Sequence, residues 1–176
     1  FMLALSRTNT DITIRYCIES SLHLMTRPKE LAHARWDEID FKARTITIPA
    51  TRMKGQSRKA ESEQQDHVIP LSKQMMRIFR ELSKFTGDSE FLFPSNIKIG
   101  QAINSQSCNV AIKRMAMYTN GERVIDEDNK PVTYKGKLTS HGLRGTASTA
   151  LNNELDEDYD VVENALSHKT GSKISQ

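Results

Sequence analysis

The sequence predicts a mostly α-helical domain with a small antiparallel β-sheet, an α+β fold. Apolar residues recur at helical spacing in several segments, as at Met75, Ile78, Phe79 and Leu82. One short run, Thr45-Ile46-Thr47-Ile48, alternates and is β-branched, which is typical of a strand. The length of 176 residues fits one domain that can bury a core without disulfides.

The composition fits a globular protein and excludes a membrane-spanning one. Hydrophobic residues make up 37% and charged residues 27%, and no apolar run reaches the length of a membrane span. The net charge of +3 permits a nucleic-acid partner without requiring one. Cys17 and Cys108 both lie in apolar helical patterns, so we interpret them as reduced core residues rather than a disulfide or metal site.

The first helical pattern leads to a joint that carries an arginine. Asp11 offers an N-cap, and apolar residues follow at helical spacing to about Met25. Pro28 suits the first position of a second helix, so Arg27 is expected between two helices. The alternative is that Arg27 only caps the helix or pairs with Glu30.

A β-hairpin follows, with Trp36 before it as a core anchor. The strand at 45–48 should pair with 67–71, and the polar loop between them is basic in its first half and acidic in its second. Such a loop can bring Lys54 to a phosphate, although an ordinary solvated turn is the alternative. The other basic residues of this loop, all candidates for contacting DNA, are Arg52, Arg58 and Lys59.

Three further helices and a polar segment complete the chain. Ser72 caps the helix that contains Met75, and another helix is expected from about Asn104 to Met117. Lys113 and Arg114 lie towards the end of this second helix and are candidate DNA contacts. Residues 118–137 have the turn signals of a loop or small hairpin, and a last helix near 156–166 should end before His168.

The stretch Thr139-Ser140-His141-Gly142-Leu143-Arg144 has the features of an anion-binding helix start. Ser140 is the expected N-cap, and apolar residues continue at helical spacing. His141 and Arg144 are three residues apart, so they share one face of the first turn. A helix N-terminus attracts anions, and an imidazole and a guanidinium there favour a phosphate.

Together these segments supply a set of groups suited to metal-free chemistry on a phosphodiester. The set is Arg27, Lys54, His141, Arg144 and His168. Arginine forks can hold a phosphate and its developing charge, and a lysine or histidine can move protons. No carboxylate cluster suggests a metal and the histidines lack zinc spacing, so neither a metal nor another cofactor is expected.

The order of these motifs resembles the tyrosine recombinases, specifically the catalytic domain of phage-type and genomic-island integrases. The matching segments cover nearly the whole chain: Met25-Thr26-Arg27-Pro28-Lys29-Glu30-Leu31, Trp36-Asp37-Glu38-Ile39-Asp40, Arg52-Met53-Lys54, His67-Val68-Ile69-Pro70-Leu71-Ser72, Ser140-His141-Gly142-Leu143-Arg144 and Ala165-Leu166-Ser167-His168-Lys169. The resemblance implies site-specific DNA recombination through a 3′-phosphotyrosyl intermediate.

The resemblance also implies a role for each site residue. Arg27 and Arg144 would clamp the scissile phosphate, and Lys54 would protonate the leaving 5′-hydroxyl. His141 would accept a proton, and His168 would donate to the phosphate. Glu30 would support the site from behind the arginines.

The family's nucleophilic tyrosine has no match among Tyr16, Tyr118, Tyr134 and Tyr159. We therefore expect residues 1–176 to be a catalytic domain truncated before the nucleophile, without the N-terminal DNA-binding domains, and inactive in cleavage. The implied partner is double-stranded DNA, bound by a homotetramer of the full-length protein in the prokaryotic cytoplasm at the nucleoid, with no membrane partner.

Two other functions fit the same residues. The chain could be a non-catalytic DNA-binding module that uses the basic groove. It could also be a helical regulator that inserts the helix beginning at Ser140 into the major groove. The regulator hypothesis expects sequence-specific binding to survive replacement of Arg27.

Overall fold

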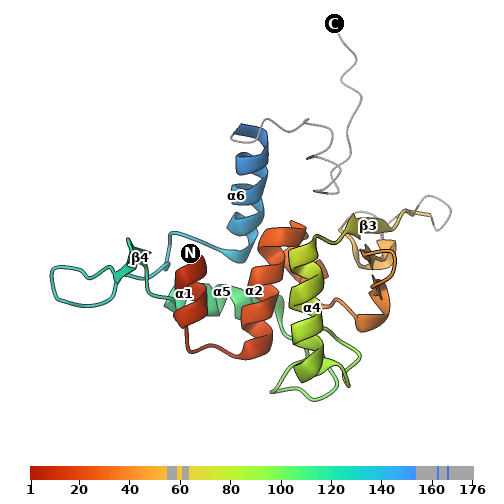
Figure 1. Ribbon diagram of the computed structural model, residues 1–176, viewed down its shortest axis with the longest axis horizontal. Helices are drawn as coiled ribbons and strands as arrows, with labels where there is room; N and C mark the ends of the chain where they lie inside the picture. The colour runs from red at the N-terminus through yellow and green to blue at the C-terminus, as the bar shows by residue number, and fades with distance from the viewer. Residues whose placement is uncertain (55–58, 61–63, 154–161, 163–165, 167–176) are drawn as a thin grey trace, which may run out of the picture.

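The computed structural model describes residues 1–54, 59–60, 64–153, 162 and 166 (Figure 1). Its α-helices are α1 (Met2–Arg7), α2 (Ile12–Leu24), α3 (Pro28–Ala32), α4 (Lys73–Thr86), α5 (Ser105–Arg114) and α6 (Ser140–Asn153). Two 3₁₀ turns are η1 (Trp36–Glu38) and η2 (Ala50–Arg52). The strands are β1 (Ile39–Asp40), β2 (Thr45–Ile48), β3 (His67–Pro70), β4 (Tyr118–Thr119) and β5 (Glu122–Arg123). The predicted α+β class is confirmed.

The main sheet is antiparallel in the order β1-β2-β3, and it forms around the predicted hairpin. Ile46 lies opposite both Ile39 and Ile69, and these three side chains are buried. Because alternate residues of a strand face opposite sides, one face of the sheet joins the core while Thr45 and Thr47 face away. Strand β1 has only two residues, which is too short for its alternation to be recognised in the sequence.

Helix α2 is the centre of the helical part, and α4, α5 and α6 all pack against it. In Figure 1 α2 and α4 stand side by side, with α6 above them. The Asp11 carboxylate caps α2 by accepting from the backbone N–H of Thr13 at 2.8 Å. The helix ends at Leu24, and its C-cap Met25 has a left-handed φ of 51° that turns the chain towards α3.

Trp36 is the predicted core anchor. Its ring meets that of Phe79 edge to face at 6.5 Å, and its Nε1 donates to the carbonyl of Thr86 at 2.9 Å. Both partners belong to α4, so the tryptophan fixes the 3₁₀ turn η1 on that helix. This combination of an apolar ring and a satisfied N–H is how tryptophan is accommodated near a core.

Two expected boundaries differ from the structure. Helix α5 ends at Arg114, three residues before the expected end, because Met115 is extended with ψ of 131° and Ala116 pairs with Thr133 in the following loop. The cap of α6 is Thr139 and not Ser140, since the Thr139 hydroxyl accepts from the N–H of Gly142 at 3.0 Å. The last expected helix, near 156–166, lies almost wholly outside the described residues.

The segment 118–137 is the small hairpin that its turn signals predicted. Asn120 and Gly121 both have positive φ, 52° and 84°, which two-residue hairpins between twisted strands require. The hairpin projects from the helical body at the left of Figure 1. Within the described ranges, no helix is both long and apolar enough to span a lipid bilayer.

Candidate active site

Arg144 is a buried cation at the beginning of α6. Its side chain reaches α2, because Nη1 donates to the carbonyl of Met25 at 2.7 Å. Nη2 donates to the carbonyl of Leu166, and the residue as a whole is 5% exposed. A buried guanidinium held by two backbone carbonyls has a fixed plane, since both contacts are directional.

Arg27 occupies the predicted joint, as the N-cap of α3. Its Nη1 pairs with Glu30 Oε1 at 3.1 Å, and the other carboxylate oxygen of Glu30 accepts from the backbone N–H of Arg27 at 3.2 Å. Glu30 is 3% exposed, whereas 24% of the Arg27 side chain is exposed. The buried carboxylate therefore holds an arginine that still reaches the surface.

Arg144 contacts the same joint that carries Arg27. Arg144 binds the carbonyl of Met25, which lies two residues before Arg27, so residues 117 positions apart in the sequence share the turn between α2 and α3. The left-handed Met25 ends α2, and its carbonyl is one of those that have no partner within the helix. Arg144 supplies the donor that the helix end lacks.

The start of α6 is fixed to α5 by a contact that sequence reasoning missed. Asn109 Oδ1 accepts from both the backbone N–H and the hydroxyl of Ser140, at 2.8 and 2.9 Å. Ser140 itself is buried. His141 is the second residue of the helix and is exposed, so the anchored turn presents an imidazole to solvent.

Lys54 lies two residues after the end of η2 and is exposed, while its neighbour Met53 is buried in the core. Among contacts within the described part of the chain, none ties the side chain of Lys54 or His141 to either arginine. His168 lies outside the described residues. The structure brings Arg144 to the turn that carries Arg27. That the five residues form one site stays a prediction.

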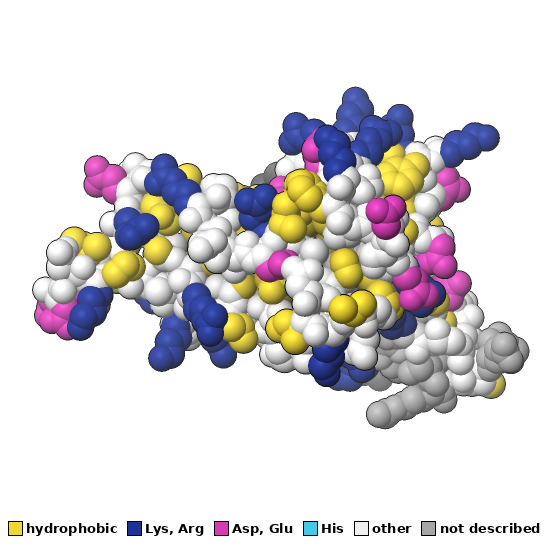
Figure 2. Space-filling model, turned by 90° about the horizontal axis from the view of Figure 1, so that it is seen from below, with side chains coloured by type: hydrophobic (Ala, Val, Ile, Leu, Met, Phe, Trp, Pro, Cys, Tyr) yellow, Lys and Arg dark blue, Asp and Glu magenta, His cyan; other side chains and the backbone are white. Residues whose placement is uncertain are grey.

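The candidate DNA contacts have different environments. Arg52 pairs with Glu38 through both terminal nitrogens, at 2.5 and 2.6 Å. Lys113 and Arg114 are exposed at the end of α5, and the carbonyl of Lys59 accepts from Gln64 at 3.1 Å. Arg58 lies outside the described residues. Figure 2 shows Lys and Arg in several separate groups on the face seen from below, rather than as one continuous basic surface.

The three described tyrosines have partners away from the arginine joint. The pKa of Tyr118 is lowered from its ordinary value, mainly by the hydrogen bond from Arg123. Burial raises the pKa of Tyr134, whose ring packs edge to face on Phe1 at 5.5 Å. Tyr16 stacks with Arg15 on α2, and Tyr159 lies outside the described residues. None of these contacts of the three described tyrosines involves Arg27 or Arg144.

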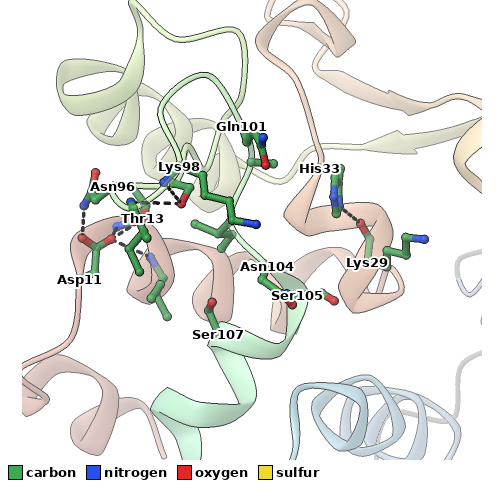
Figure 3. Close-up of a pocket in the computed structure, with 15 residues that line it drawn as sticks. Asp11, Thr13, Lys29, His33, Asn96, Lys98, Gln101, Asn104, Ser105 and Ser107 are labelled. Carbon is green, nitrogen blue, oxygen red and sulfur yellow. Dashed lines mark hydrogen bonds between the residues drawn. The ribbon is translucent and has the colours of Figure 1, made fainter.

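A separate cavity of about 460 Å³ lies between α3, the starts of α2 and α5, and the loop at 95–104 (Figure 3). Lys29, His33 and Lys98 supply its basic groups, and Asp11 and Asn96 close one side. None of the sequence-predicted site residues lines it. In the described part of the chain, no group of three or more His, Cys, Asp or Glu side chains could hold a metal.

The sequence matches the Phage integrase family over residues 1–176. The chain belongs to the phage integrase family. It is 43% identical to prophage integrase IntA of Escherichia coli strain K12 over 150 residues, which are 85% of this chain and 30% of that protein. The integrase chain thus spans less than a third of the length of this relative.

Solved structures show that the predicted tyrosine recombinase catalytic-domain fold is right. The Tn1549 transposon integrase in complex with transposon right end DNA has a TM-score of 0.67 at 16% identity, over 96% of this integrase chain and 56% of that one. A λ integrase tetramer bound to a Holliday junction has a TM-score of 0.61 at 14% identity, over 99% and 46% of the two chains. Such distant likenesses define the fold of this family member.

Sequence reasoning missed three groups that hold residues of the candidate site. They are the Met25 carbonyl, Asn109 and Glu38, which bind Arg144, Ser140 and Arg52 respectively. A helix C-terminus next to a predicted site arginine was a usable signal for the first, because such ends expose carbonyls. Asn109 and Glu38 had no local signal, since their partners lie 31 and 14 residues away.

Proposed function

We propose that this chain is the catalytic part of a site-specific DNA recombinase that integrates or excises a mobile element such as a prophage. The observation that carries the proposal is the arginine joint, in which Arg144 is held on Met25 next to Arg27. Two guanidinium groups at one turn can bind both non-bridging oxygens of a phosphodiester. Membership of the phage integrase family supports this use of the joint.

The proposed reaction is a metal-free transesterification. A tyrosine oxygen attacks the phosphorus, the bond to the 5′-oxygen breaks, and a 3′-phosphotyrosyl link keeps the bond energy for rejoining. Arg27 and Arg144 stabilise the charge that grows on the phosphorane oxygens. Lys54 gives its proton to the leaving oxygen, His141 accepts the proton of the tyrosine, and His168 donates to the phosphate. Glu30 holds Arg27 in place.

The nucleophile is proposed to come from sequence beyond Gln176. Two observations support this: the described tyrosines have their own partners elsewhere, and this chain covers only 30% of the length of IntA. The 176-residue chain alone is therefore expected to bind DNA without cleaving it. The DNA-gripping N-terminal domains of the family would likewise belong to the rest of the gene product.

The proposed partner is double-stranded DNA at attachment sites. Solved structures with this fold include a transposon integrase on DNA and a λ integrase tetramer on a Holliday junction. By analogy we propose a homotetramer of the whole gene product on DNA. It would act in the bacterial cytoplasm, on DNA of the nucleoid.

The test is covalent trapping of the whole gene product on suicide attachment-site DNA in the presence of EDTA. A protein–DNA adduct that resists denaturation and disappears in Arg27→Ala is the expected result. Failure to form an adduct on a proven cognate site would argue against the function. The same assay on residues 1–176 should give no adduct.

The runner-up function is a non-catalytic DNA-binding module, favoured only by the lack of a matching tyrosine within the 176 residues. Both functions require DNA affinity that falls with salt. The two functions predict different gene sequences. A tyrosine codon two to three helical turns after His168 supports the enzyme, and a stop codon directly after Gln176 supports the module.

A further inference from the structure

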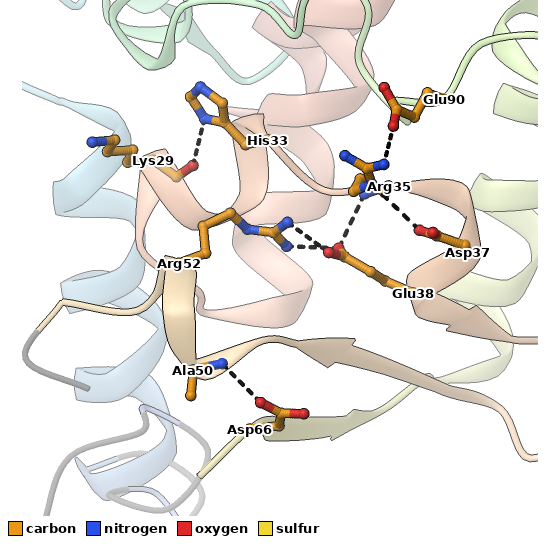
Figure 4. A network of polar contacts seen from close by, with 9 residues as sticks. All are labelled: Lys29, His33, Arg35, Asp37, Glu38, Ala50, Arg52, Asp66 and Glu90. Atoms are coloured by element: carbon orange, nitrogen blue, oxygen red, sulfur yellow. Dashed lines mark hydrogen bonds and ion pairs between the residues drawn. The ribbon is translucent and has the colours of Figure 1, made fainter. Parts of the chain in front are cut away.

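The root of the β2–β3 hairpin is joined to the turn before β1 by a two-point ion pair. Arg52 Nη1 lies 2.5 Å from Glu38 Oε1, and Nη2 lies 2.6 Å from Oε2 (Figure 4). The side chains are only 17% and 10% exposed. A parallel fork of this kind fixes orientation as well as distance, and burial protects it from screening by salt.

Glu38 is itself held in position. Its Oε2 also accepts from the backbone N–H of Arg35 at 3.0 Å, so the carboxylate cannot turn without breaking three contacts. Glu38 ends η1, the turn that Trp36 fixes to α4 through the Thr86 carbonyl. The ion pair therefore attaches the hairpin root to a packed part of the molecule.

Lys54 leaves this root two residues after Arg52. Between them, Met53 is 3% exposed and its backbone N–H donates to the carbonyl of Ala50 at 3.1 Å. On the other side of the root, Asp66 Oδ1 accepts from the N–H of Ala50 at 2.8 Å. The backbone that carries Lys54 is thus held by a buried side chain, a backbone turn, a carboxylate and the Arg52–Glu38 pair.

We propose that Glu38 is a positioning residue for Lys54, acting through Arg52, so that the ammonium reaches the leaving 5′-oxygen. The proposal rests on the function proposed above and deepens it. It also gives Arg52 a role different from the DNA contact that its sequence position indicated. Its two terminal nitrogens hold the hairpin root, and any direct phosphate contact through them would require the pair to open.

The step that Glu38 supports is one proton transfer. As the tyrosine oxygen bonds to phosphorus, the bond from phosphorus to the 5′-oxygen breaks, and a proton moves from Lys54 Nζ to that oxygen, leaving a neutral amine and a 5′-hydroxyl. An alkoxide is nearly as basic as hydroxide, so it leaves poorly without this proton. A thiol has a pKa of about 8.5, so a 5′-thiolate leaves without an acid.

This difference provides the test. The whole gene product is compared on two suicide substrates, one with the ordinary 5′-oxygen and one with sulfur at the bridging 5′ position. On the oxygen substrate we expect Glu38→Gln and Arg52→Ala to slow cleavage by roughly 10- to 100-fold, part of the 10²–10⁴ that general acid catalysis supplies. On the sulfur substrate both variants should cleave within about threefold of the wild-type rate, since no acid is needed.

Three controls keep the result interpretable. Glu81→Gln breaks the exposed ion pair with Lys84 on α4, and it should leave both rates unchanged. Arg52→Lys keeps the charge but loses the fork, so it should show the same oxygen-specific defect without loss of fold, checked by thermal unfolding. Adding Glu38→Gln to Lys54→Ala should not slow cleavage of the oxygen substrate further, because the effects of residues that act through one group are not additive.

Equal slowing of both substrates by Glu38→Gln would overturn the proposal and leave the recombinase function intact, as would full additivity with Lys54→Ala. If Lys54→Ala is not rescued by sulfur, Lys54 is not the acid and the positioning role fails with it. If the wild-type protein cleaves neither substrate on a proven site, the proposed function itself fails.

Discussion

The Nη1 of Arg144 donates to the carbonyl oxygen of Met25 at 2.7 Å, which places a residue of α6 at the end of α2. Arg27 follows two residues later and pairs with the buried Glu30. One arginine is 5% exposed, and the other keeps 24% of its side chain in solvent. The two residues proposed to do the same chemistry therefore contribute differently to the fold.

Replacing Arg144 by Ala should reduce both activity and stability. The change leaves the carbonyls of Met25 and Leu166 without this donor, and a buried unsatisfied polar group costs about 1–3 kcal/mol. Chemical denaturation of residues 1–176 measures the lost stability. A variant as stable as wild type would contradict the buried contacts.

Replacing Arg27 by Ala should slow adduct formation strongly, with a smaller loss of stability than Arg144→Ala. Removal of one donor to a transition-state charge costs about 10²–10³ in rate. The Arg27 side of the Arg27–Glu30 pair is partly exposed, and after Arg27→Ala the Glu30 carboxylate still accepts from the backbone N–H of residue 27, so the loss should be smaller than for the buried contacts of Arg144. Single-turnover cleavage and denaturation of the same preparations separate the two effects.

Thr139→Ala should weaken the start of α6 by about 1 kcal/mol, the usual value of an N-cap hydroxyl. The Thr139 hydroxyl is the one that accepts from the N–H of Gly142. Ser140→Ala should act differently, by removing the hydroxyl bond to Asn109. The variant Thr139→Ser keeps a capping hydroxyl, so it should be nearly as stable as the wild type. The expectation fails if Thr139→Ala unfolds at the wild-type denaturant concentration.

DNA affinity should depend on salt, and the exposed cations should set the slope. If Lys113 contacts a phosphate, Lys113→Ala makes the negative slope of log K against log salt shallower by about 0.9, the value for one phosphate contact on B-DNA. Arg52→Ala should leave the slope unchanged, because both terminal nitrogens of the Arg52 guanidinium donate to Glu38. Fluorescence anisotropy over a salt series measures the slope for both variants. A shallower slope for Arg52→Ala would show that Arg52 contacts DNA.

The two cysteines should be unreactive in the folded protein. Cys17 is buried, and its pKa is raised by a hydrogen bond with Cys108 and by burial. Because the thiolate is the reactive form, a raised pKa slows attack on a thiol reagent at pH 8. Both thiols should react only after denaturant is added, and fast labelling of the native protein would disprove this packing.

The sequence by itself determined the features that depend on neighbours in the chain. Helical spacing predicted α2, α4 and α5, alternation predicted β2, and Asn120-Gly121 predicted the small hairpin, because each pattern is read over a few residues. The joint at Arg27 followed from Pro28 in the same way. Family resemblance, which uses the order of such patterns, added the fold, and solved structures with that fold confirm it.

Only the tertiary structure decided the partners of the site residues. Asn109 binds Ser140 across 31 positions, and Arg144 binds Met25 across 119. Thr139 caps α6 while the Ser140 hydroxyl donates to Asn109, and both terminal nitrogens of Arg52 pair with Glu38. Local patterns record which surfaces a segment must bury, whereas a hydrogen-bond partner depends on which distant segment packing brings within about 3 Å.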